Sequence, residues 1–276
     1  MRMDTVAKFG SACAAMLLPM LVEAAWNGAV DAATGAYVVT VAAGTDVTLS
    51  AEDAAALGTD VDLVKRGAGR LVIATNLKAQ GWAGELRVEE GYLRAREVGA
   101  LGTAAKGTVV SDGATFEVDG SAVEANTSGF VSGEPFTITG RGMKEGDEEM
   151  GVIRNVANSQ YPGISSVTML GDCLYTGVEA NGRLDVRSDT LDMNGHTLTV
   201  RGYFALTSAA LAHPGHIAVV GDALLGERAR LQRRRGEPPD GRLRRARHPP
   251  GGEGEPPLDA RAAGRGEGRT ADVRVG

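Results

Sequence analysis

Short apolar segments return at a nearly constant step between Leu49 and Ile138, and this periodicity constrains the fold more than any other feature. One series has separations of 22, 22, 23 and 22 residues, and a second has separations of 23 and 22. The first series is Leu49, Leu71, Leu93, Phe116 and Ile138, and the second is Leu86, Val109 and Val131. Two parallel series predict two strands per repeat. A repeat this short cannot bury an apolar face alone, so its neighbours must stack on it in a solenoid.

The repeats have the composition of short strands joined by tight turns. Each reads strand, glycine turn, strand, as in LRVEEGYLRA at residues 86–95, TVVSDGATFEV at 108–118 and FVSGEPFTI at 130–138. Gly supplies 39 of the 276 residues, about twice its usual share, and aromatic residues only 4%. We therefore predict an all-β solenoid over residues 25–226, with rungs of about 22 residues.

The first 24 residues have the pattern of a secretory signal peptide. Arg2 and Lys8 give a positive start, and Ala12–Val22 is an apolar run of 11 residues. Small residues precede a predicted cleavage site after Ala24. The alternative is an uncleaved anchor, but a bilayer span needs about 20 apolar residues, and Pro19 interrupts this run. We predict a secreted or cell-surface bacterial protein that meets a membrane only during export.

Three local patterns refine the picture. Residues 144–163 break the periodicity with an acidic stretch and a Tyr-Pro-Gly turn, so an insertion is predicted there. Ala51–Leu57 reads as a short helix that Ser50 could cap. Asn194-Gly195 lies between apolar segments and predicts a tight turn, either between two rung strands or in a plain antiparallel hairpin.

The chain changes character after Gly226. Residues 227–276 include 13 Arg, 9 Gly and 6 Pro and carry a net charge of +5, whereas residues 1–226 carry −11. Low apolar content predicts a disordered tail. An Arg-rich arm for nucleic acid is the alternative, although the tail has no aromatic residue for base stacking. A third hypothesis is out-of-frame translation of GC-rich DNA, because the strand pattern stops in mid-rung.

Residues 63–102 resemble the autotransporter-associated β-strand repeat, also called the passenger-associated transport repeat. The matching positions are Leu63, Lys65, Gly67, Gly69, Leu71–Ile73, Asn76, Trp82, Gly84, Leu86–Val88, Gly91, Leu93 and Leu101-Gly102. The resemblance implies a right-handed parallel β-helix exported to the cell surface. The sequence departs from that family by ending without a C-terminal β-barrel, so it is either a fragment or a chain exported by another route.

Pairs of carboxylates are the first candidates for chemistry. Glu117 and Asp119 alternate along one predicted strand and should point to one face, and Asp185 with Asp189 or Asp192 lies on adjacent strands. Carboxylates of this kind serve acid–base catalysis on polysaccharides or bind Ca²⁺. Alternation in exposed strands also produces such pairs by chance, which is the interpretation we favour.

Other candidate residues have simpler structural explanations. His213 and His216 have no third ligand in view, and the acidic stretch Glu145, Asp147, Glu148 and Glu149 lacks the pattern of a Ca²⁺ loop. Gly67 and Gly69 precede a strand and predict a turn. Trp82 and Tyr92 are expected to close the repeat rather than stack on sugar rings. After removal of the signal, Cys173 is the single cysteine, so no internal disulfide is predicted.

The sequence thus predicts an exported structural or adhesive protein, a passenger-type β-helix stalk without catalytic, cofactor-binding or metal-binding residues. Expected partners are a host surface or an extracellular polysaccharide, and not nucleic acid. Residues 26–49 are expected to cap the N-terminal end of the stack. The alternatives are a carbohydrate-active β-helix enzyme, in which charged side chains would converge in a groove, and a sugar-binding module with exposed coplanar aromatic rings.

Overall fold

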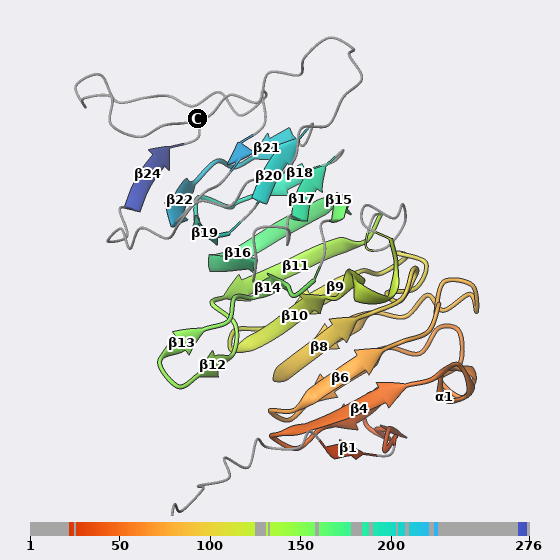
Figure 1. The fold of residues 1–276 in the computed structure, drawn as a ribbon. Coiled ribbons are helices and arrows are strands. Elements are labelled where there is room, and N and C mark those ends of the chain that lie inside the picture. Colours follow the sequence, from red (N-terminus) through yellow and green to blue (C-terminus); the bar gives the residue numbers. More distant parts are fainter. Residues whose placement is uncertain are drawn as a thin grey trace, which may run out of the picture.

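The protein is a parallel β-solenoid of about seven turns, with about 23 residues in each turn, and only 5% of it is helical. Figure 1 shows the strands stacked in chain order. The computed structural model describes residues 22–24, 26–124, 131, 133–157, 160–177, 184–187, 190–202, 204–207, 210–220, 224–225 and 270–274. The predicted fold class is confirmed, and the observed turn is close to the predicted 22-residue rung.

Strands from successive turns pair in parallel along three rows, which we call the first, second and third ladders. The first ladder contains β3 (Tyr37–Thr40), β5 (Leu63–Arg66), β7 (Leu86–Val88), β9 (Thr108–Val110), β11 (Pro135–Gly140), the first half of β16 (Ser166–Gly177), β18 (Thr190–Asp192) and β21 (Ala210–Ala212).

The second ladder follows the first around the turn. It contains β1 (Val22–Ala24), β4 (Thr45–Leu49), β6 (Arg70–Ile73), β8 (Gly91–Ala95), β10 (Ala114–Val118), β14 (Ile153–Asn155), the second half of β16, β19 (Thr197–Arg201) and β22 (His216–Val220). Strand β16 belongs to both ladders because its 12 residues run through the corner between them.

The third side of the solenoid changes along the stack. In the early turns it is formed by loops that contain two short helices, α1 (Ala51–Ala55) and a 3₁₀ helix (Gly120–Ala122). In the later turns it is a third parallel ladder of β15 (Gln160–Ile164), β17 (Leu184–Arg187), β20 (Phe204–Thr207) and β23 (Leu224–Leu225). The sequence did not predict this third ladder.

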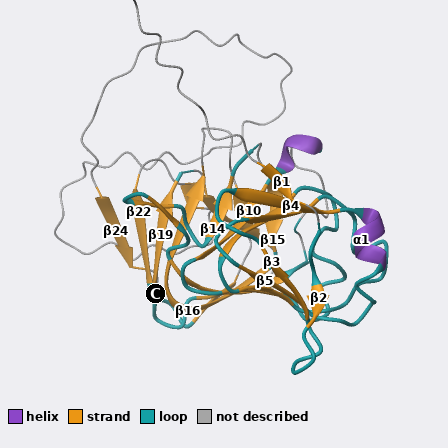
Figure 2. Ribbon diagram, turned by 90° about the horizontal axis from the view of Figure 1, so that it is seen from below, coloured by secondary structure: helices purple, strands orange, loops and turns teal. Residues whose placement is uncertain are grey.

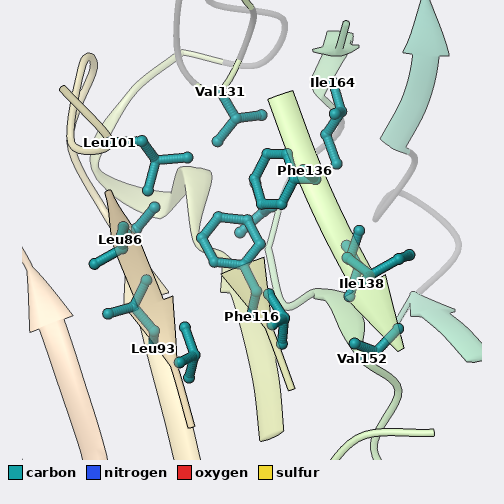
Figure 3. Close-up of a cluster of buried hydrophobic side chains, with 14 of the residues drawn as sticks. Leu86, Leu93, Leu101, Phe116, Val131, Phe136, Ile138, Val152 and Ile164 are labelled. Atoms are coloured by element: carbon teal, nitrogen blue, oxygen red, sulfur yellow. The ribbon is translucent and has the colours of Figure 1, made fainter. Parts of the chain in front are cut away.

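Alternating strand residues point inward and form a continuous apolar core. Leu71, Leu93 and Phe116 lie directly above one another in the second ladder, as their spacing predicted. Phe116 meets Phe136 of the first ladder across the interior, with ring centroids 4.9 Å apart and planes tilted by 52° (Figure 3). Tilted aromatic pairs of this kind add about 0.5–1.5 kcal/mol beyond area burial.

Other members of the two periodic series do not lie in the columns that their sequence spacing predicted. Leu49 pairs with Ile73 rather than Leu71, and Ile138 lies in the first ladder beside Val110. Val109 pairs with Arg87, so it lies in the outward row of the first ladder. The 22-residue step from Phe116 to Ile138 is therefore coincidental, because turns of unequal length place the two residues in different ladders.

Glycine permits the corners of successive turns to approach closely. Gly67 has a φ of +76°, and a Cβ there would lie 2.3 Å from the carbonyl oxygen of Val41 in the preceding turn. Gly69 has no such φ, but its Cβ would lie 2.1 Å from the Ala42 oxygen. The predicted turn is therefore confirmed, and its glycines are required by contact between rungs.

The two other local predictions can also be compared with the structure. Helix α1 begins after Ser50, whose side chain accepts from the Asp53 amide, while the Asp53 carboxylate accepts from the Ser50 amide. This capping box confirms the predicted cap, and Figure 2 shows α1 at the periphery of the stack. Asn194-Gly195 forms a turn between β18 and β19, which both pair in parallel with other turns, so the hairpin alternative is wrong.

The predicted insertion at 144–163 contains one small hairpin and two rung strands. Strands β12 (Lys144–Glu145) and β13 (Glu148–Glu149) pair in antiparallel fashion and leave the stack, as Figure 1 shows. Strands β14 and β15, which follow, belong to the second and third ladders. The hairpin is thus confined to a few residues between β11 and β14.

Both ends of the described stack carry additional strands. At the N-terminal end, β2 (Ala29–Val30) pairs antiparallel with β3, and β1, which lies within the predicted signal peptide, pairs with β4. At the other end, β24 (Thr270–Arg274) pairs antiparallel with β22. The rest of the predicted signal and tail lies outside the described residues. No helix in the described ranges is long and apolar enough to cross a membrane.

Candidate functional site

Charged side chains converge on the outer side of the second ladder, and we call Asp46, Arg70, Arg94, Glu117, Asp119 and Arg154 the arginine–carboxylate cluster. Parallel register places Arg94, Glu117 and Arg154 directly beside one another on β8, β10 and β14. Their side chains point outward because the alternate residues, such as Phe116, fill the core. The stacking of turns thus assembles a site from residues far apart in sequence.

Glu117 is the centre of this cluster. Its Oε2 atom accepts from Arg70 Nε at 2.8 Å and from Arg94 Nε at 2.7 Å. Its Oε1 atom lies 3.5 Å from Arg154 Nη1. Arg70 also donates from Nη1 to Asp46 Oδ1 at 3.2 Å. One buried carboxylate therefore orients three guanidinium groups.

Burial and charge separate the cluster into two levels. The Glu117 side chain is 0% exposed, whereas those of Arg70, Arg94 and Arg154 are 15%, 25% and 20% exposed. Burial alone would disfavour the charged form of Arg70, but the neighbouring Glu117 and Asp46 carboxylates outweigh it and raise its pKa. The carboxylate lies beneath, and the arginine side chains above it are partly exposed.

The small hairpin borders the cluster. Tyr92 donates from its hydroxyl to Glu145 Oε1 at 2.7 Å, and burial together with this carboxylate raises the pKa of Tyr92. Arg70 lies over the Tyr92 ring, 4.8 Å from its centroid. Thr115 holds the base of the hairpin by accepting from the Met143 amide and donating to the Gly151 carbonyl. The hairpin is therefore fixed to the rungs that carry the cluster.

The geometry limits the chemistry that the cluster can perform. A general acid or base must reach the substrate, and Glu117 is fully enclosed by its own arginine partners. Asp119, which is nearly buried, accepts from the Ser121 amide at 3.0 Å and lies 3.6 Å from Arg94 Nη1. What the cluster offers to solvent is N–H donors on arginine, which suit the recognition of oxyanions.

A second buried charge has a structural explanation. Lys65 points into the corner of its turn and donates to the carbonyl groups of Arg66, Gly67 and Glu90, with the Glu90 bond 2.8 Å long. Burial lowers its pKa to about 8, while the Glu90 carboxylate acts in the opposite direction. The three donors of the ammonium group are all used, so Lys65 is a cap for turn carbonyls.

Among the described residues, the structure brings together the predicted carboxylate pair of Glu117 and Asp119. Glu117 and Asp119 both meet Arg94, as predicted for residues on one face. Asp185 is buried, and Asp189 lies outside the described residues. Asp192 instead faces His213, whose Nδ1 atom is 3.0 Å from Asp192 Oδ1.

The remaining candidate residues do not form a metal centre. Among the described residues, no three His, Cys, Asp or Glu side chains lie together as a metal site requires. In the acidic stretch, Glu149 accepts from Arg141 Nε at 2.6 Å, and Glu148 lies 3.6 Å from Arg201 Nη1. Trp82 is buried and donates to the Val61 carbonyl at 2.9 Å, so its ring is not available for stacking on sugars.

The arginines of the cluster were missed by sequence reasoning. Arg70 and Glu117 are 47 residues apart, and a single sequence with irregular turns does not reveal that they meet. A usable signal was present for Arg94 and Glu117. Each follows a core residue of the periodic series, Leu93 or Phe116, by one position, so both had to point outward on adjacent turns.

Fold and site together define the protein as a parallel β-solenoid with a charged cluster on one outer face. Comparison of the chain with protein-family models, with curated proteins and with solved structures finds no match.

Proposed function

We propose that the chain is an exported structural and adhesive surface protein, a passenger-type β-helix stalk without catalytic activity. The burial of Glu117 beneath its arginine partners carries the proposal, because a buried and ion-paired carboxylate cannot transfer a proton to a bound substrate. A stack of similar turns also suits a stalk, since each added turn extends the molecule and buries its apolar face on the previous one.

Two features of the sequence support export to the surface. The first 24 residues have the charge and apolar run of a signal peptide, and residues 63–102 resemble the autotransporter-associated β-strand repeat. Under this proposal the outer faces and the hairpin are the surfaces that meet the surroundings of the cell.

The proposal is tested by locating the protein in a bacterial host. The full chain, with an epitope tag, is expressed beside a matched chain that lacks residues 1–24, and intact cells are treated with protease. We expect surface cleavage of the full chain and protection of the truncated one. Retention of the full chain in the cytoplasm would contradict export.

A second assay addresses the absence of catalysis. The purified chain is incubated with acidic and neutral polysaccharides, and reducing ends and unsaturated products are measured. We expect none above background. Products that disappear in the Glu117→Gln variant would show that the cluster is catalytic and would favour the alternative of a carbohydrate-active β-helix enzyme.

A further inference from the structure

The solvent side of the arginine–carboxylate cluster is a row of partly unused hydrogen-bond donors. A guanidinium group has five N–H donors. Arg94 uses Nε for Glu117, and its Nη1 atom is 3.6 Å from Asp119, beyond a good hydrogen bond. Arg154 makes one contact, from Nη1 to Glu117 at 3.5 Å. Within the described part of the chain, the other N–H groups of these two side chains have no protein acceptor.

These donors are held in place from below. Because Glu117 lies on the strand between those of Arg94 and Arg154, it draws both guanidinium groups toward one point. Arg70 approaches the same carboxylate over the ring of Tyr92. An oxyanion that arrives from solvent would meet preorganised donors, which reduces the entropic cost of binding.

We propose that this row binds the carboxylate or sulfate groups of an acidic polysaccharide. Arginine suits both groups because its planar fork of donors matches their oxygen atoms. Strands β8 and β14 lie on either side of β10, so the Cα atoms of Arg94 and Arg154 are about 10 Å apart along the stack, while their guanidinium groups converge on Glu117. On the next two turns the same register positions hold Thr176, which is buried and donates to the Met150 carbonyl, and Arg201, which lies 3.6 Å from Glu148 of the hairpin, so the open part of the row is Arg94 and Arg154.

The row favours a polymer with repeated anionic groups over a single small anion. Arg94 and Arg154 lie on the strands on either side of β10, so two neighbouring anionic groups of one chain can each meet an arginine. Polysaccharide is favoured over single-stranded nucleic acid because the aromatic ring beside the cluster, that of Tyr92, is buried under Arg70 and cannot stack on a base. This inference gives a ligand class to the adhesive part of the proposed function and rests on it.

Direct binding to the purified full chain tests the inference. Immobilised protein is titrated with polygalacturonate, which carries carboxylates, with dextran sulfate, which carries sulfates, and with neutral dextran and single-stranded DNA. We expect binding of one or both acidic polysaccharides, weakening with salt, and none of neutral dextran. The two acidic arms distinguish carboxylate from sulfate as the recognised group.

Variants separate this row from general charge attraction. Arg154→Gln removes the arginine whose contact with Glu117, at 3.5 Å, is the longest of the three. Arg87→Gln is the control, because it makes the same change in charge on the outer side of the first ladder. We expect Arg154→Gln to weaken binding at least about fivefold, as for loss of a charged hydrogen bond, and Arg87→Gln to change it less than about twofold. Arg94→Lys keeps the charge but loses the fork, so weaker binding is expected with the fold intact by circular dichroism.

Three results would overturn the inference: equal effects of Arg154→Gln and Arg87→Gln, binding of neutral dextran, or binding of DNA as tight as that of the polysaccharides. Failure of binding in a chain that still reaches the cell surface would reject this ligand class and leave the stalk in place. Retention in the cytoplasm with intact binding would instead reject the proposed export.

Discussion

Glu134 offers a quantitative test of how this solenoid tolerates buried charge. Its side chain precedes β11 and is only 3% exposed, and its Oε1 atom accepts from the Thr108 hydroxyl at 2.7 Å. Burial raises its pKa from 4.5 to about 7, and the Thr108 hydrogen bond only partly opposes this shift. We predict that Glu134→Gln removes a pH-dependent loss of stability.

The sign and size follow from the two pKa values. The unfolded chain loses this proton near pH 4.5, whereas the folded chain keeps it until about pH 7, so folding stability falls as the pH rises through this window. The full difference corresponds to about 3 kcal/mol above pH 7. The free energy of unfolding of Glu134→Gln, relative to that of wild type, should therefore rise by about 3 kcal/mol between pH 4 and pH 8.

Urea denaturation followed by circular dichroism at several pH values measures this difference. Other titrating groups are common to both chains and cancel when the two profiles are subtracted. Glu89→Gln is the matched control, because it makes the same substitution at a more exposed side chain that is paired with Arg66, and the comparison of the two variants isolates the buried position. Parallel profiles for Glu134→Gln and wild type would refute the assigned burial of the charge.

Three further outcomes are expected. Lys65→Met removes the lysine donor from the Gly67 and Glu90 carbonyls, while the Arg66 carbonyl keeps the Val41 amide, and should lower the free energy of unfolding by about 3 kcal/mol in urea melts; Lys106→Met, on the exposed surface, should change it little. Val167 lines a small apolar cavity, so Val167→Ile should raise the unfolding free energy by about 0.5–1 kcal/mol; outward-facing Val109→Ile is the control, and an equal gain there would exclude cavity filling. Burial raises the pKa of the Cys173 thiol to about 12, so in a Cys13→Ser chain alkylation measured by mass spectrometry at pH 8 should be slow until urea is added; rapid labelling of the native chain would contradict this burial.

The fold was predictable from the sequence where one turn follows another without inserted residues. The separation of 22 or 23 residues places Leu71, Leu93 and Phe116 in one column, and the structure has them in register. The prediction failed where turns change length. After Phe116 the chain completes a longer turn, so the residue beside it is Ile153 and not Ile138.

The site was less predictable because its geometry depends on pairing between turns. The alternation of Glu117 and Asp119 correctly predicted a shared face, but burial of Glu117 depends on Arg70 and Arg94 from earlier turns. Local spacing shows which side of a strand a residue occupies. It does not show which cation lies beside it once the register has shifted.

Strand β16 changes how the stack should respond to force. Most turns pass from one ladder to the next through a glycine corner, so a pulled end could peel away turn by turn. Strand β16 instead continues through the corner and pairs with β11, β14, β18 and β19. Peeling from the C-terminal end must therefore break pairing in two ladders together at this strand. We therefore expect β16 to resist peeling more than the strands on either side of it, so that the turns before it stay folded after the later turns have been pulled away.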